Sequence, residues 1–210
     1  MKLASTLSLS IALLTLVCAF GNKTHDAQVQ YHGCGLTGSA RSPIVQQLNY
    51  LKNRSSLPKT KDINPAITLE AVLATGKDSR RWPDNSAAEI EGTVFDVKPG
   101  GIESTNCAAQ GLADRDTHIE IVRSMDDSGP TRRMILEITP RVRAMAHGRG
   151  LDWSTEALQP LIGHRVKVRG WMMFDFEHND ESENTAPNRK DNWRATAWEI
   201  HPVTDISILN

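Results

Sequence analysis

The chain has 210 residues, and its 24 Lys and Arg nearly balance its 25 Asp and Glu. A near-neutral charge argues against a general nucleic-acid binder, whose affinity comes mainly from many contacts between basic side chains and phosphates. The length suits one large domain, or one domain with an extension, and is sufficient to bury a core without covalent staples.

Residues 1–19 have the features of a secretory signal peptide. Lys2 supplies a positive charge, the apolar run Leu7–Val17 is too short to anchor the chain in a bilayer, and Cys18-Ala19 allows cleavage before Phe20. Lipidation at Cys18 is the alternative, but such signals usually carry a smaller residue than Val before the cysteine. We therefore expect a soluble product exported to the periplasm or the extracellular space, with no later membrane span.

Residues 20–84 are expected to form a polar leader that carries two short helices. Ser42-Pro43 is typical of a helix start, and the apolar residues that follow at helical spacing predict a helix from 43 to about 53. A second apolar run predicts a helix over 65–75, which Gly76 ends.

Two cysteines remain after the signal peptide, Cys34 in the leader and Cys107 beyond it. In an oxidising compartment such a pair is a candidate disulfide. Spacing alone does not show that the two residues meet, so two unrelated thiols are the alternative.

From residue 85 to the C-terminus the apolar pattern changes to a period of two, which indicates β-strands. The expected elements are strands over 90–97, 118–125, 132–139, 165–174 and 193–203, the last of which 206–209 could extend, a hairpin turn over 126–130 and a helix over 152–161. A helix between the third and fourth of five strands is the order of an OB-fold, a mainly β, partly open Greek-key barrel. Gly170 fits a strand that must curve sharply. A β-sandwich is the competing fold, but five strands are few for one.

Histidine and carboxylate side chains gather on the strand faces opposite the apolar ones, or directly after a strand. They are Asp116, His118, Glu120, Glu137, Asp175, His178, Glu199 and His201. Because side chains alternate along a strand, those on the strands should all lie outside the barrel interior.

This polar set has two interpretations. Three of its members, His118, His178 and His201, could hold a divalent metal such as zinc, with Glu137 or Glu199 as a general base on bound water. The alternative is that the outer face of a barrel is polar because it meets water.

Arginine is frequent between residues 132 and 169, and an anion could bind there through Arg141. We favour the alternative that the acidic loop after residue 174 folds back and pairs with these arginines. Among the tryptophans, Trp171 is the best candidate for an exposed stacking platform, whereas Trp153 and Trp198 are expected in the core.

Four stretches together resemble a loose family of exported bacterial proteins with OB-like domains. They are Asp114–Glu120, Glu137–Pro140, Gly170–His178 and Trp198–Val203, which carry a D-x-D-x-H step, an F-D-x-x-H step and an E-[IL]-H-P-V ending. The resemblance covers about residues 85 to 206. It implies the fold and export, and it leaves function open because the family has no established activity.

Two functions therefore remain. The favoured one is an exported binding module that holds a saccharide, a small anion or a protein on its outer face, with Asp116, Asp175, Arg141 and Trp171 as candidate binding residues. The other is a metal-dependent hydrolase, for instance a phosphodiesterase. The sequence contains none of the usual phosphate-loop, zinc-protease or nucleophile-elbow motifs, which is why we favour binding.

Overall fold

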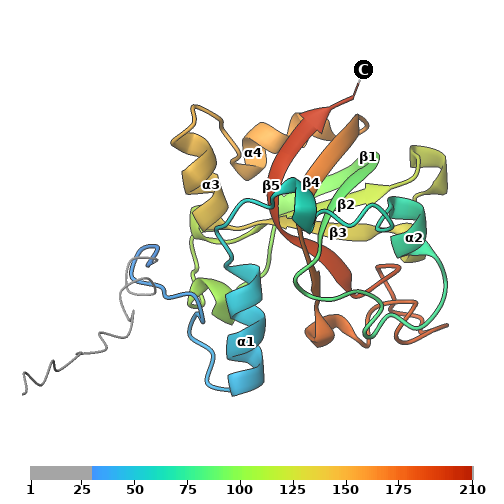
Figure 1. Cartoon of the computed structure of the whole chain (residues 1–210), viewed down its shortest axis with the longest axis horizontal. Helices are drawn as coiled ribbons and strands as arrows, with labels where there is room; N and C mark the ends of the chain where they lie inside the picture. Colours follow the sequence, from blue (N-terminus) through green and yellow to red (C-terminus); the bar gives the residue numbers. More distant parts are fainter. Residues whose placement is uncertain (1–29, 210) are drawn as a thin grey trace, which may run out of the picture.

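Five strands close into a barrel in the computed structural model, which describes residues 30–209 (Figure 1). The strands are β1 (Ala87–Pro99), β2 (Thr117–Val122), β3 (Met134–Ile138), β4 (Arg165–Phe174) and β5 (Trp198–Ile208). Their order around the barrel is β1-β2-β3-β5-β4, with β3 and β5 parallel and all other neighbours antiparallel. The predicted mainly β, five-stranded barrel is confirmed. The predicted signal peptide lies outside the described residues.

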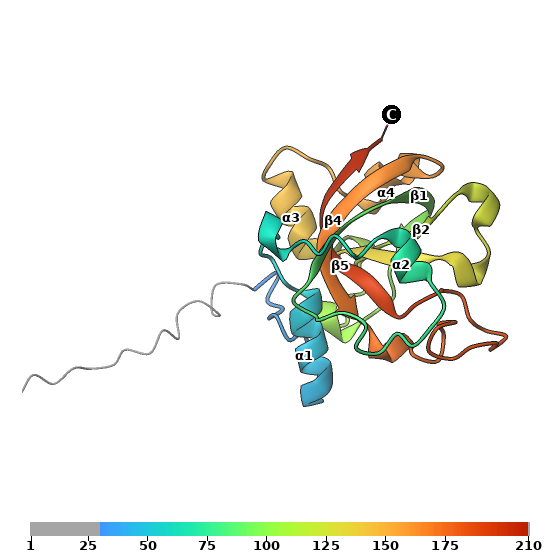
Figure 2. The same ribbon diagram turned by 45° about the vertical axis from the view of Figure 1, so that its right-hand side comes forward.

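Two helices precede the barrel and two lie between β3 and β4. They are α1 (Pro43–Lys52), α2 (Leu69–Leu73), α3 (Pro140–His147) and α4 (Thr155–Leu158). In both ribbon views α1 lies at one end of the barrel and the C-terminus at the other (Figures 1 and 2). None of the helices in the described part of the chain has the length and apolar composition needed to cross a bilayer.

Helix α3 differs from the prediction, in which the helix between the third and fourth strands lies at 152–161. The predicted segment contains the short helix α4 and a 3-10 turn, while the longer helix α3 precedes it. Local chemistry starts α3: Pro140 occupies the first helical position, and the Thr139 hydroxyl accepts a hydrogen bond from the Val142 amide. Two arginines early in α3 obscure its apolar face in the sequence.

Several predicted strand ends shift in the structure. The predicted hairpin turn over 126–130 is replaced by two 3-10 turns, Met125–Asp127 and Pro130–Arg132, so β2 ends earlier and β3 begins later than expected. The fifth strand begins at Trp198 rather than at residue 193, and it ends at Ile208, one residue before the end of the predicted extension.

Alternate residues of the strands fill the barrel interior with aliphatic side chains. Ile119 and Ile121 of β2 face Leu136 of β3 and Val168 of β4 within one buried cluster. Trp153 and Trp198 belong to the same cluster, as expected. The opposite faces of β2, β3 and β5 are therefore left for polar side chains.

A disulfide between Cys34 and Cys107 ties the leader to the loop that joins β1 to β2. The two cysteines are 73 residues apart in the chain. In the chain-entropy model, closing a loop of this length constrains the unfolded state by about 4 kcal/mol. The leader therefore has a covalent as well as a packed attachment to the barrel.

Gly170 marks the point where β4 bends across β5. The register between the two strands shifts on both sides of this glycine. A Cβ added at Gly170 would overlap the Ile200 Cγ2 atom and the carbonyl oxygen of Pro202. Absence of a side chain is thus what allows the two backbones to approach.

We expect Gly170→Ala to lower the free energy of unfolding by about 1–3 kcal/mol, the usual effect of forcing an extra carbon into a packed site. Gly101→Ala is the matched control, because a Cβ there meets no atom within 4 Å, and its effect should stay within about 0.5 kcal/mol. Urea unfolding followed by circular dichroism measures both. Equal stability of the two variants would contradict the close approach.

Candidate functional site

Strand pairing brings three polar side chains into one row on the outer face of the barrel. His118 lies opposite Glu137 in the β2–β3 register. Because Leu136 of β3 lies beside Ile200 of β5, the next residues of the two strands, Glu137 and His201, are also neighbours. His118 Nδ1 lies 3.1 Å from Glu137 Oε1, and His201 Nδ1 lies 3.7 Å from Glu137 Oε2.

Burial shows that this row is not a hydrated surface. His201 is fully buried, and Glu137 is only 5% exposed. Asp116, immediately before β2, is also buried and lies beside the row, with its Oδ2 atom 3.4 Å from His201 Nε2. The interpretation of the polar face as one that meets water is wrong for these residues.

Three segments cover the row. From α1, Lys52 Nζ lies 2.9 Å from Asp175 Oδ2 and 2.9 Å from Glu103 Oε2. From the β1–β2 loop, the Asn106 amide donates a 3.0 Å hydrogen bond to Asp116. From the β4–β5 loop, Arg194 Nη1 lies 2.7 Å from Glu199 Oε1.

The covered face is the one that OB-folds use for ligands. In that fold the faces of the second and third strands and the loops after the first and fourth strands contact the ligand. Here the loops of residues 100–116 and 175–197 occupy those places and enclose polar side chains rather than leaving them open.

The enclosed group holds more acidic than permanently basic side chains. Four buried carboxylates face two buried cations; they are Asp116, Glu137, Asp175 and Glu199 against Lys52 and Arg194. Glu120, also buried, has its own partners in Lys98 and Arg133. The excess of negative charge favours a further positive group among the four carboxylates.

In the structure that positive group is the imidazole of His201. Burial alone would lower the pKa of His201, but its close contacts with the Asp116 and Glu199 carboxylates outweigh burial and raise the pKa to about 10. Burial raises the pKa of Glu137 to about 7, against the opposing effects of His118 and His201. One carboxyl of the cluster therefore titrates near neutral pH, next to an imidazolium.

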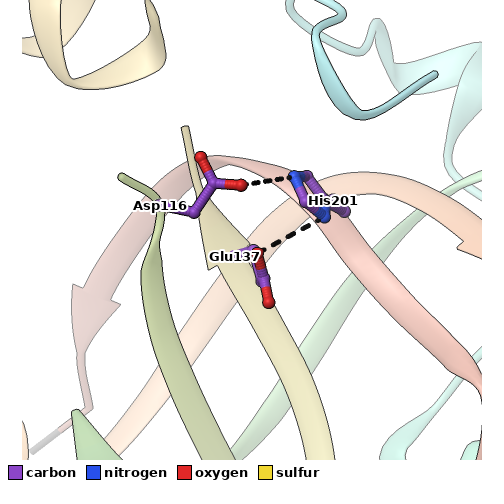
Figure 3. A group of neighbouring side chains, drawn as sticks. All are labelled: Asp116, Glu137 and His201. Atoms are coloured by element: carbon purple, nitrogen blue, oxygen red, sulfur yellow. Dashed lines mark ion pairs between the residues drawn. The ribbon is translucent and has the colours of Figure 1, made fainter. Parts of the chain in front are cut away.

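Asp116 Oδ2, Glu137 Oε2 and His201 Nε2 are shielded from water and make no hydrogen bond of normal geometry with a described residue, and the same holds for Asp175 Oδ2 and both Nη atoms of Arg194. The first three take part only in ion pairs with one another's side chains, at 3.4 Å between Asp116 Oδ2 and His201 Nε2 and at 3.7 Å between Glu137 Oε2 and His201 Nδ1. One potential ligand atom from each of Asp116, Glu137 and His201 lies within 4.8 Å of the other two. Figure 3 shows both carboxylates beside the His201 ring. Because buried polar atoms normally make hydrogen bonds of good geometry, this convergence of weakly satisfied atoms is a candidate site for a further positive group.

A second cluster, Asp175, His178 and Glu199, has the same spacing of potential ligand atoms. Its carboxylates already have permanent cations, Lys52 on Asp175 and Arg194 on Glu199. His178 Nδ1 lies 2.8 Å from Glu181 Oε2. An added cation would have to displace these partners, so this cluster is the weaker candidate.

The three predicted histidine ligands do not form one set. Among the described residues, neither group of converging ligand atoms contains more than one histidine. The Trp193 ring lies against both His118 and His178, at centroid distances of 5.6 and 5.7 Å. His118 is instead paired with Glu137 and Glu120, whose hydrogen bonds outweigh burial and raise its pKa to about 9.

Arg141 and Trp171, predicted as binding residues, hold the leader. The Arg141 guanidinium donates to the carbonyl oxygens of Cys34 and Gly35. The Trp171 Nε1 atom donates a 2.7 Å hydrogen bond to the carbonyl oxygen of Ser56. The groups that were expected to bind an anion or a stacked ring are therefore bonded to backbone carbonyls of the leader.

The arginines of 132–169 do not pair with the acidic loop as we favoured. Arg133 pairs with Glu120 of β2, while Arg165 and Arg169 of β4 pair with carboxylates of β1. The loop carboxylates have other partners, as Asp175 has in Lys52. Neighbouring strands neutralise the arginines because they present opposite charges in register.

Two residues of the site, Lys52 and Arg194, are not among the predicted ones. Lys52 follows Leu48 by four residues, so both lie on the buried face of α1. A lysine at that position of an amphipathic helix was the available signal. Arg194 had no comparable signal, because it lies in a loop whose course depends on tertiary contacts.

Comparison of the chain with models of known protein families and with curated proteins finds no match. The site therefore has to be interpreted from its own geometry.

We expect Arg194→Met to lower the free energy of unfolding by about 3–5 kcal/mol, because it leaves the buried Glu199 carboxylate without its cation. Arg189→Met is the matched control, since the Arg189–Asp180 pair of the same loop is at least half exposed and contributes at most about 1 kcal/mol. Chemical denaturation of both variants measures the difference. Similar losses in the two would contradict the enclosure of Glu199.

Proposed function

We propose that this protein is an exported OB-like binding module whose ligand is a divalent cation, held by Asp116, Glu137 and His201. The observation that carries the proposal is the convergence of one potential ligand atom from each of these three buried residues, whose only contacts with one another are ion pairs of 3.4 and 3.7 Å. The excess of buried carboxylates over permanent cations supports it, because a divalent ion would neutralise that excess.

The donor set suggests the identity of the ion. One imidazole with two carboxylates suits Zn²⁺, and less strongly Mn²⁺, which lies lower in the affinity order of divalent metals. Ca²⁺ prefers six to eight oxygen ligands, which this group does not offer. Glu199 Oε2 lies 3.3 Å from His201 Nδ1 and would orient the ring so that Nε2 faces the ion.

Enclosure supports binding over the hydrolase alternative. A catalytic metal keeps an open position for water and substrate. Here the three ligands lie beneath α1 and two loops and are at most 5% exposed. Glu137 and Glu199, considered above as general bases, become a ligand and an orienting group in this proposal.

We expect the purified protein to bind one Zn²⁺ per chain, measured by isothermal titration calorimetry and by elemental analysis after dialysis. At a free Zn²⁺ concentration 100-fold above Kd, binding should add about 2.7 kcal/mol to the free energy of unfolding. Mn²⁺ should bind more weakly, and Ca²⁺ should give no comparable stabilisation.

Two variants locate the ion. His201→Gln removes the nitrogen ligand, and Glu137→Gln keeps the shape of a side chain that titrates near neutrality, so it preserves the fold best; both should abolish stoichiometric binding. His147→Gln changes an exposed histidine at the end of α3 and should bind Zn²⁺ like the parent protein. Absence of Zn²⁺ binding in the parent protein, or equal binding by Glu137→Gln, would overturn the proposal.

Export is the second part of the proposal and rests on the signal-like residues 1–19. The Cys34–Cys107 disulfide is compatible with an oxidising compartment. Intact-mass measurement of the protein recovered from a bacterial host should give a chain that begins at or near Phe20. A diacylglyceryl adduct on Cys18 would show that the exported protein is anchored to the membrane and would contradict a soluble product. An uncleaved chain in the cytoplasm would contradict export.

A further inference from the structure

A pocket of about 520 Å³ opens at one end of the barrel. Its walls come from the segment between α2 and β1, from Phe174 at the end of β4 and from Trp198 at the start of β5. The volume lies within the range of small-molecule sites, and the mouth of a β-barrel is one of their usual places. Trp198 and Glu199 point to opposite faces of β5, so the pocket is separate from the proposed cation site.

Three aromatic rings form the apolar part of this pocket. Trp198 lies at its base, with the Trp82 ring centroid 5.4 Å away and nearly perpendicular, and the Phe174 centroid 5.5 Å away. Trp198 Nε1 donates a 2.8 Å hydrogen bond to the Asp78 carbonyl oxygen, and the Arg81 guanidinium lies 5.3 Å from the centroid of Trp82. These contacts fix two of the rings before any ligand binds, which lowers the entropy cost of binding.

The rim of the pocket is polar and electrically balanced. It carries the Arg80 guanidinium and the Asp84 carboxylate, both exposed, together with Ser79. Neither the Arg80 nor the Asp84 side chain makes a hydrogen bond within the described part of the chain, so both can serve a ligand. Arg80 also has a left-handed backbone with φ of 63°, a conformation that costs a non-glycine residue energy and that often occurs at binding sites.

We propose that this pocket binds a neutral saccharide, with one pyranose ring against the partly exposed Trp82 and Phe174 side chains and its hydroxyl groups bonded to Arg80 and Asp84. A β-linked glucose unit fits this chemistry, because its equatorial substituents leave apolar C–H groups on both ring faces and hydroxyls around the edge. A quaternary ammonium ligand would also stack on aromatic rings, and it is therefore the competing occupant that the experiment has to test. The hydroxyl-bonding groups around the rim favour a saccharide over a purely apolar ligand.

The probe is cellotriose, titrated into the mature, oxidised protein and followed by tryptophan fluorescence and calorimetry. We expect saturable binding with a Kd in the range of about 0.1–1 mM, typical of weak small-ligand affinity. Trp82→Ala should weaken binding at least about tenfold, as truncation of a central aromatic contact does. Asp84→Asn and Arg80→Gln, both at exposed positions, should weaken it severalfold without affecting folding.

Trp171→Phe is the matched control, because it changes a tryptophan outside this pocket and should leave the cellotriose affinity unchanged. Choline chloride is titrated in parallel. Three outcomes would overturn the proposal: no response to cellotriose up to about 10 mM, an unchanged affinity in both Trp82→Ala and Asp84→Asn, or binding of choline in place of cellotriose. Because Zn²⁺ is omitted, the result is independent of the proposed cation site.

Discussion

A group of charged side chains shut away from water is the constraint on which much of this structure depends. Buried ions are costly unless each has a close partner of opposite charge. Lys52 from α1 and Arg194 from the β4–β5 loop supply two of those partners, so both segments have to fold against the outer face of the barrel. The disulfide between Cys34 and Cys107 fixes the leader close to the same face. Residues before the barrel thus complete its polar site.

Alternation along β5 divides the molecule into two chemical environments. Glu199 and His201 enter the charged cluster, whereas Trp198 and Ile200 join the apolar core. A buried ion pair is weak evidence for stability, because well-packed apolar residues often stabilise as much. The oriented imidazole and carboxylates are the groups that we propose hold a divalent cation. Trp198, on the face of β5 opposite Glu199, forms the aromatic base of the pocket at the barrel mouth.

Prediction from the sequence succeeded where local pattern decides the structure. The limits of β4 agree with the prediction, because its alternating pattern lies between a glycine turn and a polar loop. Alternation also assigned His118, Glu137 and His201 to one face, but it could not reveal what covers that face. The predicted convergence of three histidines is wrong. His178 lies in the loop after β4, where its ring packs against Trp193, and strand alternation does not determine the course of such a loop. The role of Lys52 was missed because lysines on helices are usually solvated.

The parallel pairing of β3 with β5 has a consequence for how the chain reaches its final form. β5 is the last strand in the sequence, yet it pairs with both β3 and β4 and closes the barrel. Until it emerges, β3 and β4 each have an unpaired edge, which is a template for association with other chains. Glu137 also lacks one of its two imidazole neighbours, His201, until then. A nascent chain is therefore most exposed to aggregation just before β5 is available for pairing, and contacts of long sequence separation make that closing step slow.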